Sequence, residues 1–161
     1  MKIHLCAVGR LRAGPERTLV NDYLDRFGKT GRALGLGPAV EHEVEDKKNL
    51  GMKAEGELLA RAVPAGAALV VLDERGRVLS SPEFAGALAT WRDGGRQDVA
   101  LVIGGADGID PSLRAKADLA VSFGAMVWPH MLVRVMLAEQ LYRAATILAG
   151  LPYHRASVQV S

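Results

Sequence analysis

The sequence predicts one α/β domain in which a mostly parallel β-sheet is covered by helices on both faces. Two observations lead to this prediction. Short runs that are apolar throughout, such as Ala68–Asp73 and Val99–Ile103, alternate along the chain with segments of helical periodicity. Strands buried on both faces read as continuous apolar runs, and parallel strands need a connecting helix. The 161 residues contain no repeat or linker, so residues 1–161 are expected to form a single domain.

The amino-terminal half predicts two strands and two helices. Pro15 suits a first helical turn, and apolar residues follow it at helical spacing. The second helix is weakened by two internal glycines and ends at Pro64. The charged run Glu41–Lys48 is expected to be a solvated connection rather than a site. The expected elements are the strand Lys2–Val8, the helix Pro15–Phe27, a strand near Ala39–Val44 and the helix Asn49–Val63.

The carboxy-terminal half predicts three strands alternating with three helices. Ser81 is expected to cap a helix whose first helical residue is Pro82. Gly150 supplies a stop for the last helix. The expected elements are the strand Ala68–Asp73, a helix from Ser81 to Trp91, the strand Val99–Ile103, a short helix from Pro111, the strand Leu119–Ser122 and a long helix from Pro129 to Ala149.

Composition excludes some classes of protein and leaves others open. No apolar run approaches the roughly 20 residues of a membrane span, and no signal peptide is evident. The single cysteine, Cys6, suits a reducing cytosol and is expected to be a buried structural thiol. The four histidines lack metal-ligand spacing, so no metal site is expected. A net charge of +2 permits an RNA partner without demonstrating one.

Three loops follow strands at the edge of the sheet where ligands bind in open α/β folds. None matches a dinucleotide fingerprint, a P-loop or a hydrolase nucleophile elbow. A single such loop would be expected only to turn the chain, but three together predict a ligand pocket. Its backbone groups would hydrogen-bond an adenine edge, between apolar walls made by Leu72, Phe123 and Met126. The loops are 72–76, 104–108 and 123–128.

The last helix is apolar over well over half of its circumference. Its polar residues, Glu139, Tyr142, Arg143 and Thr146, share one narrow stripe. Such a helix needs cover on more than one side. The sheet supplies one cover, and a second subunit is the expected source of the other. The alternative is a central helix buried within a monomer.

The segment from Pro129 to Arg155 carries several cations and only one acid, Glu139. Arginine forks match phosphate oxygens, and aromatic rings can stack on bases. Each residue also has an ordinary explanation: Arg143 can pair with Glu139, Tyr142 can pack, and His130 can cap the helix. The residues concerned are Arg134, Arg143, Arg155, His130 and His154, with Trp128, Tyr142 and Tyr153 as stacking candidates.

Five motifs together resemble one known family. They are Leu72–Gly76, Val102–Gly108, Trp128-Pro129-His130 with Arg134, Glu139–Ala144, and Pro152–Arg155, and they occur in family order along a chain of matching length. The sequence is similar to the ribosomal large-subunit methyltransferase H (RlmH) family of the SPOUT superfamily. The resemblance implies a homodimer with a carboxy-terminal trefoil knot. It also implies S-adenosylmethionine-dependent methylation of N3 of a pseudouridine in helix 69 of 23S ribosomal RNA, on assembled 70S ribosomes in the cytoplasm.

The resemblance also assigns roles to residues. Two departures bear on them: Val127 stands where the family often has threonine, and Ala156–Ser161 extends beyond the usual ending. The cofactor residues would be Leu72, Gly104, Gly105, Phe123, Gly124, Ala125, Met126, Val127 and Trp128. The chemistry of the carboxy-terminal side chains gives the further hypothesis that His130, Arg134, Arg143 and Arg155 face RNA and that His154, Arg155, Tyr142 and Arg134 are catalytic.

Methylation of an imide nitrogen requires loss of its proton, and His154 is the expected base because histidine titrates near neutrality. Arg155 or Arg134 would stabilise negative charge or hold phosphate, while Tyr142 positions the target. Glu139 is a weaker candidate because Arg143 would keep it paired. Two alternatives stay open: a SPOUT methyltransferase with another RNA target, and a ribosome-binding factor without catalysis. A tail around His154 that only packs the dimer or contacts RNA is also an open reading.

Overall fold

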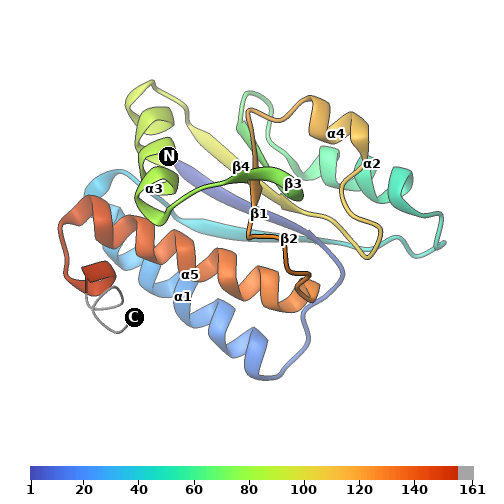
Figure 1. The fold of residues 1–161 in the computed structure, drawn as a ribbon, viewed down its shortest axis with the longest axis horizontal. Coiled ribbons are helices and arrows are strands. Elements are labelled where there is room, and N and C mark those ends of the chain that lie inside the picture. Colours follow the sequence, from blue (N-terminus) through green and yellow to red (C-terminus); the bar gives the residue numbers. More distant parts are fainter. Residues whose placement is uncertain (156–161) are drawn as a thin grey trace.

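Five strands form one sheet in the order β2-β1-β4-β3-β5, and every pairing is parallel, as predicted (Figure 1). The computed structural model describes residues 1–155, so the predicted effect of the Ala156–Ser161 extension lies outside the described residues. The carboxyl ends of β3, β4 and β5 lie at one edge. The strands are β1 (Lys2–Val8), β2 (Ala39–Val44), β3 (Ala68–Val78), β4 (Asp98–Ile103) and β5 (Leu119–Ser122).

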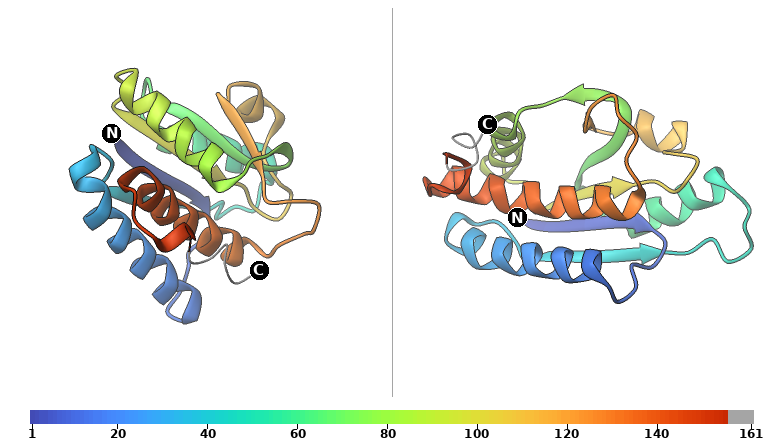
Figure 2. Two further views of the ribbon diagram at one scale, coloured as in Figure 1. Left: turned by 60° about the vertical axis from the view of Figure 1, so that its left-hand side comes forward. Right: turned by 60° about the horizontal axis from the view of Figure 1, so that its bottom comes forward.

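Helices cover both faces of this sheet, also as predicted (Figure 2). One face packs against α1 (Pro15–Gly31), α3 (Ser81–Asp93) and α5 (His130–Ala149). The other packs against α2 (Met52–Ala62) and α4 (Pro111–Ala115). A 3-10 turn over residues 32–34 follows α1. No helix within residues 1–155 has the length and apolar character to cross a membrane.

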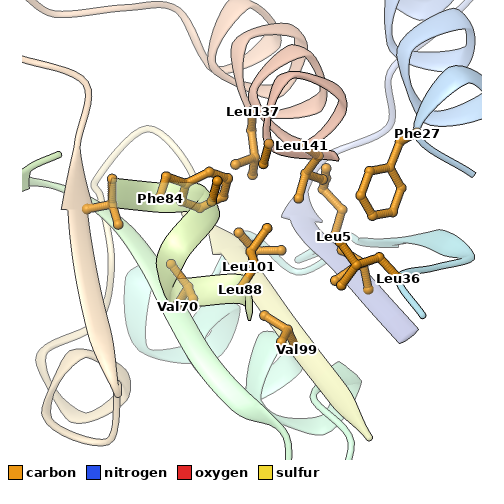
Figure 3. Packing of buried hydrophobic residues seen from close by; sticks show 14 of the residues in the cluster. Leu5, Phe27, Leu36, Val70, Phe84, Leu88, Val99, Leu101, Leu137 and Leu141 are labelled. Carbon is orange, nitrogen blue, oxygen red and sulfur yellow. The ribbon is translucent and has the colours of Figure 1, made fainter. Parts of the chain in front are cut away.

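The larger core lies between the sheet and helices α1, α3 and α5. Successive side chains of a strand point to opposite faces, so Leu5 enters this core whereas Cys6 enters the smaller one beneath α2. Leu137 and Leu141 of α5 pack between Phe27 of α1 and Phe84 of α3 (Figure 3). Cys6 is fully buried, and burial raises the pKa of its thiol to about 12, which fits the predicted structural role.

Strand β3 continues beyond its predicted end at Asp73. Residues 73–76 leave the ladder as a bulge, after which Arg77 pairs again with Val121 of β5. A side chain at Gly76 would start 2.6 Å from the Ala120 carbonyl carbon, so only glycine permits this close passage. The segment predicted as a loop is thus a bulge held at both ends.

Helix ends also differ from the predictions. The residue that caps α3 is Ser80 rather than Ser81: its hydroxyl accepts from the Glu83 N–H while Glu83 accepts from the Ser80 N–H. This reciprocal capping box fixes the register of the helix start. Helix α1 runs four residues beyond Phe27, through Gly31, and leads directly into the turn at 32–34.

The prediction of a solvated connection was wrong for the first part of the run Glu41–Lys48. Glu41 and Glu43 belong to β2 and accept from Arg17 of α1, with Arg17 Nη1 2.6 Å from Glu41 Oε1. His42 lies beside His4 of β1, with Nε2 and Nδ1 3.0 Å apart and the rings stacked. Sequence periodicity cannot reveal these pairings, because the partners come from distant segments.

The His4–His42 pair gives stability a pH dependence. His4 Nε2 lies 2.7 Å from Asp98 Oδ1, and one nitrogen of the His4–His42 contact must accept a hydrogen bond. Burial, together with the charges of His4 and Lys2, lowers the pKa of His42 below 6.5.

We expect the free energy of unfolding to decrease as pH falls below about 6.5, because the unfolded chain then binds a proton at residue 42 that the folded chain excludes. Urea denaturation at several pH values measures this change. His42→Gln should flatten this part of the dependence, whereas His130→Gln, at an exposed position, should leave it unchanged. Parallel curves for wild type and His42→Gln would contradict the assignment.

Candidate active site

A cavity of about 410 Å³ lies where the three strand ends meet the start of α5. This volume is in the range of small-molecule sites. The structure brings eight of the nine predicted cofactor residues together around it, and Ala125 is not among the lining residues. Those that line it are Leu72, Gly104, Gly105, Phe123, Gly124, Met126, Val127 and Trp128.

A second, mostly apolar cavity of about 250 Å³ adjoins the first. Leu72, Phe123 and Gly124 line both cavities, so the loop after β5 separates them. The smaller cavity extends beneath Phe84 of α3 and Leu137 of α5. The predicted apolar walls of the site are therefore present, and they continue into the space between α3 and α5.

The loop after β4 turns back tightly on itself. A side chain at Gly104 would start 2.5 Å from the Gly108 carbonyl oxygen, and one at Gly105 would start 2.7 Å from a carboxylate oxygen of Glu55. Backbone bridging between Gly105 and Gly108 closes the turn. The paired glycines therefore allow the close approaches that shape this wall of the cavity.

Acidic groups lie around the cavity. Burial would raise the pKa of Asp73, but hydrogen bonds from the Arg75 N–H and from Arg114 outweigh it and hold that pKa below its usual value. Burial, with repulsion from Asp46 and Asp107, raises the pKa of Glu55. Asp107 itself is exposed and lines the cavity. Arg75 and Arg114 also line the cavity and pair with Asp73, so it is Asp107 that favours a ligand carrying positive charge.

The start of α5 places two predicted RNA-facing residues differently. His130 lines the cavity, and its predicted capping alternative was wrong, because Pro129 occupies the cap position without a side-chain bond. Arg134 is 4% exposed and turns inward. Its Nη1 donates to Glu43 Oε2 at 2.5 Å and its Nη2 to the Gly9 carbonyl at 3.1 Å. A phosphate or catalytic role for Arg134 would require it to leave these partners.

The Arg134 guanidinium belongs to an ionic cluster with Arg17, Glu41 and Glu43. Glu43 accepts from the Leu11 N–H at 2.6 Å as well as from both arginines. Burial would raise the pKa of Glu43, but the Leu11 N–H and the charges of Arg134 and Arg17 outweigh it and lower that pKa. The cluster joins α5 to α1 and to the carboxyl ends of β1 and β2.

The opposite end of α5 carries the remaining predicted residues. Arg143 pairs with Glu139 one turn away, as the ordinary explanation predicted, and this bond raises the pKa of Arg143. Arg143 Nη1 also lies 3.1 Å from His154 Nδ1. Tyr142 is half-buried against Tyr23 and Tyr153. Arg155 is exposed.

These two groups of residues lie at opposite ends of one helix (Figure 1). Arg143 contacts His154 and lies 13 positions after His130, so about 20 Å of helix separates His154 from the cavity. His130 at its start lines the cavity, whereas His154 and Arg155 follow its end. Reacting groups must approach to about 3–3.5 Å, so His154 and the cavity of the same chain cannot act on one substrate in this structure.

Helices α1 and α3 flank α5 and cover much of its apolar surface. The second cover predicted from a partner subunit is thus supplied in part within the chain. Apolar side chains nevertheless remain exposed around the cavity and the first turn of α5, where Val127 is 86% exposed. The patch consists of Met126, Val127, Trp128, Met131 and Leu132.

Comparison with known proteins identifies the family of the chain. Residues 1–154 match the family described as "Predicted SPOUT methyltransferase". Two proteins named "Ribosomal RNA large subunit methyltransferase H" are similar over 96% of this chain and 99% of their own length: 71% identical in Ruegeria sp. (strain TM1040) and 74% in Ruegeria pomeroyi. The chain belongs to the SPOUT methyltransferase family. A probable methylase family protein from Haemophilus influenzae matches 94% of this chain and 68% of its own, with a TM-score of 0.49 and 12% identity.

The residues present fit the cofactor of a SPOUT methyltransferase, S-adenosylmethionine. The cavity offers Leu72, Phe123 and Trp128 as apolar surface for an adenine ring. It also offers Asp107 as a negative group for a cationic molecule. Within residues 1–155 no group of three or more histidine, cysteine or acidic side chains is arranged to hold a metal ion.

Some residues around the cavity, and others that pair with Arg134, were not singled out from the sequence. Glu55 on α2 contacts the Gly105 loop, and Asp107 was read only as part of a glycine-rich turn. The acids at 41 and 43 were assigned to solvent although they pair with Arg134. Only Asp107 had a detectable signal, because it lies between glycines at a strand end.

Proposed function

We propose that the protein transfers a methyl group from S-adenosylmethionine to N3 of a pseudouridine in helix 69 of 23S ribosomal RNA, on assembled 70S ribosomes in the cytoplasm. The observation that carries the proposal is the 71–74% identity, over 96% of the chain, to proteins named for large-subunit ribosomal RNA methylation. The cavity at the strand ends supports it, because its apolar and acidic lining suits a cationic adenosyl cofactor.

The cofactor supplies a methyl group on a positively charged sulfur. The chain's contribution is to hold donor and acceptor in line and to stabilise charge, which needs no metal. We propose the nine predicted cofactor residues for the first task, Ala125 included through its backbone. Asp107 joins them, since its carboxylate lines the same cavity.

We further propose that the protein acts as a homodimer in which the tail of one subunit completes the cavity of the other. The helix length that separates His154 from its own cavity supports this arrangement. The exposed patch Met126–Leu132 provides apolar surface for a partner. His130, Arg143 and Arg155 are proposed to face RNA, with His154, Tyr142 and Arg155 near the reacting base. Arg134 can take the RNA-facing or catalytic role predicted for it only if it leaves Glu43 and the Gly9 carbonyl. The trefoil knot stays a prediction.

The test is methyl transfer from labelled S-adenosylmethionine to 70S ribosomes, free 50S subunits and naked 23S RNA, with the modified nucleotide mapped. Label at one helix 69 pseudouridine, on 70S ribosomes only, is the expected result. Asp107→Arg, which places a cation in the cofactor cavity, serves as the inactive control. Label at another nucleotide would show that the enzyme has a different RNA target. Cofactor binding without methyl transfer to any substrate would favour a non-catalytic ribosome-binding factor.

A further inference from the structure

The hydrogen bond between Arg143 and His154 decides where the imidazole carries its proton. Arg143 Nε and Nη2 donate to Glu139 at 3.1 and 2.9 Å, and its Nη1 lies 3.1 Å from His154 Nδ1. A guanidinium has only donors, so His154 Nδ1 must accept. This contact therefore requires the tautomer whose proton lies on Nε2.

The surroundings hold this geometry in place. The Tyr153 hydroxyl donates to Glu139 Oε2 at 2.9 Å, and the Arg143 guanidinium lies 4.8 Å above the Tyr153 ring. The side chains of Glu139 and Arg143 are only 17% and 13% exposed. The titratable groups packed around this turn include Glu139, Tyr142 and Arg143 of α5, Tyr153 of the turn, and Tyr23 and Arg26 of α1.

We propose that Glu139 and Arg143 are positioning residues that hold His154 as its Nε2–H tautomer, and that His154 acts as a hydrogen-bond donor to the target base rather than as a proton acceptor. This inference rests on the proposed function. The lone pair that a general base needs lies on Nδ1 and is already occupied by the Arg143 N–H. The group left to face a substrate is the Nε2–H donor.

The reaction balances without proton transfer to His154. The N3 proton of the target base passes to solvent water, and the negative charge spreads over N3 and its two neighbouring carbonyl oxygens. The N3 electron pair forms the bond to the methyl carbon, while the carbon–sulfur bond breaks and leaves its pair on sulfur. His154 Nε2–H stabilises the charge on one carbonyl oxygen, and the adjacent Arg155 adds positive charge.

Nuclear magnetic resonance of ¹⁵N-labelled histidine tests the tautomer without any assay of activity. The chain has four histidines, and His154→Gln assigns the resonance of interest. The full-length protein is expected to show His154 as the Nε2–H form at neutral pH. Arg143→Met should convert it to a mixture of forms, whereas Arg26→Met, which removes an arginine near Tyr142, should leave it unchanged. An Nδ1–H or doubly protonated ring in the wild type would overturn the proposal.

Single-turnover methylation of ribosomes then tests the donor role. The amide nitrogen of glutamine reaches the place of Nε2, whereas that of asparagine lies near the place of Nδ1. His154→Ala and His154→Asn should lower the rate about 10²-fold, and His154→Gln should stay within about tenfold of wild type. Rates should continue to rise with pH rather than level off near neutrality, because solvent takes the proton.

Outcomes separate the two proposals. The donor role would be overturned, and the base role restored, by two results together. His154→Gln would be as inactive as His154→Ala, and the wild-type rate would level off near neutral pH. Loss of the tautomer in Glu139→Gln, with circular dichroism unchanged, would support positioning by that carboxylate. Absence of methylation by the wild type, with the Nε2–H tautomer present, would overturn the proposed function and leave the positioning of His154 standing.

Discussion

Replacing Arg134 by methionine is expected to lower the free energy of unfolding by about 3 kcal/mol. The guanidinium is 4% exposed and is bonded to Glu43 and to the Gly9 carbonyl, with Glu41 3.6 Å away. Methionine fills similar space but leaves two partly buried carboxylates with Arg17 as their shared cation, while Glu43 keeps the Leu11 N–H. Removing one member of a buried ionic cluster exposes the cost of burying the others. Equilibrium urea denaturation measures the loss.

Arg10→Met is the matched control, because Arg10 pairs with Glu45 at 3.7 Å with a side chain that is 69% exposed. A surface pair of this kind contributes about 0–1 kcal/mol, so little change is expected. Adding Glu43→Gln to Arg134→Met should recover part of the lost stability. If Arg134→Met lowers the free energy of unfolding by less than about 1 kcal/mol, the prediction is wrong, because Glu43 then does not need Arg134 to neutralise its charge.

Two inactive variants are expected to regain methylation when they share one dimer. Asp107→Arg spoils the cofactor cavity, and His154→Ala removes the tail donor. If each tail serves the partner's cavity, a purified heterodimer has one site that lacks both defects and one that carries both. It should therefore recover about half of the wild-type activity. The reason is the length of α5, which separates His154 from the cavity of its own chain.

The control is a heterodimer of wild type with the double variant Asp107→Arg/His154→Ala. Under the same arrangement each of its sites carries one defect, so it should be nearly inactive. Activity in this control, together with none in the mixed single variants, would place tail and cavity in the same subunit. A protein that sediments as a monomer while methylating ribosomes would contradict the shared site altogether.

The fold was predictable from local pattern, and its departures have physical causes. Apolar runs located four of the five strands, since burial on both faces dictates their composition, whereas β2 at the sheet edge carries Glu41 and Glu43. The end of β3 was missed because Arg77 and Val78 pair with β5 only after a bulge, which no periodicity signals. The capping residue is Ser80, one position before the predicted Ser81, because a capping box pairs Glu83 with the residue three positions before it.

The candidate site was predictable where it depends on chain order and not where it depends on contacts across the fold. The three cofactor loops follow parallel strands, so topology alone brings Leu72, Gly104 and Phe123 together. The pairing of Arg134 with Glu43 joins residues 91 positions apart and left no local trace. The Arg143–Glu139 pair was visible because one helical turn separates the two residues.

The placement of α5 has a consequence for synthesis of the chain. This helix is the last long element, yet Leu137 and Leu141 fill the centre of the larger core between α1 and α3 (Figure 3). While the chain is being translated, the sheet face that α5 covers stays exposed until residues through Ala149 have left the ribosome. A nascent chain stalled earlier presents a wide apolar surface to chaperones and proteases. The protein can therefore complete its larger core only when its own translation is nearly finished.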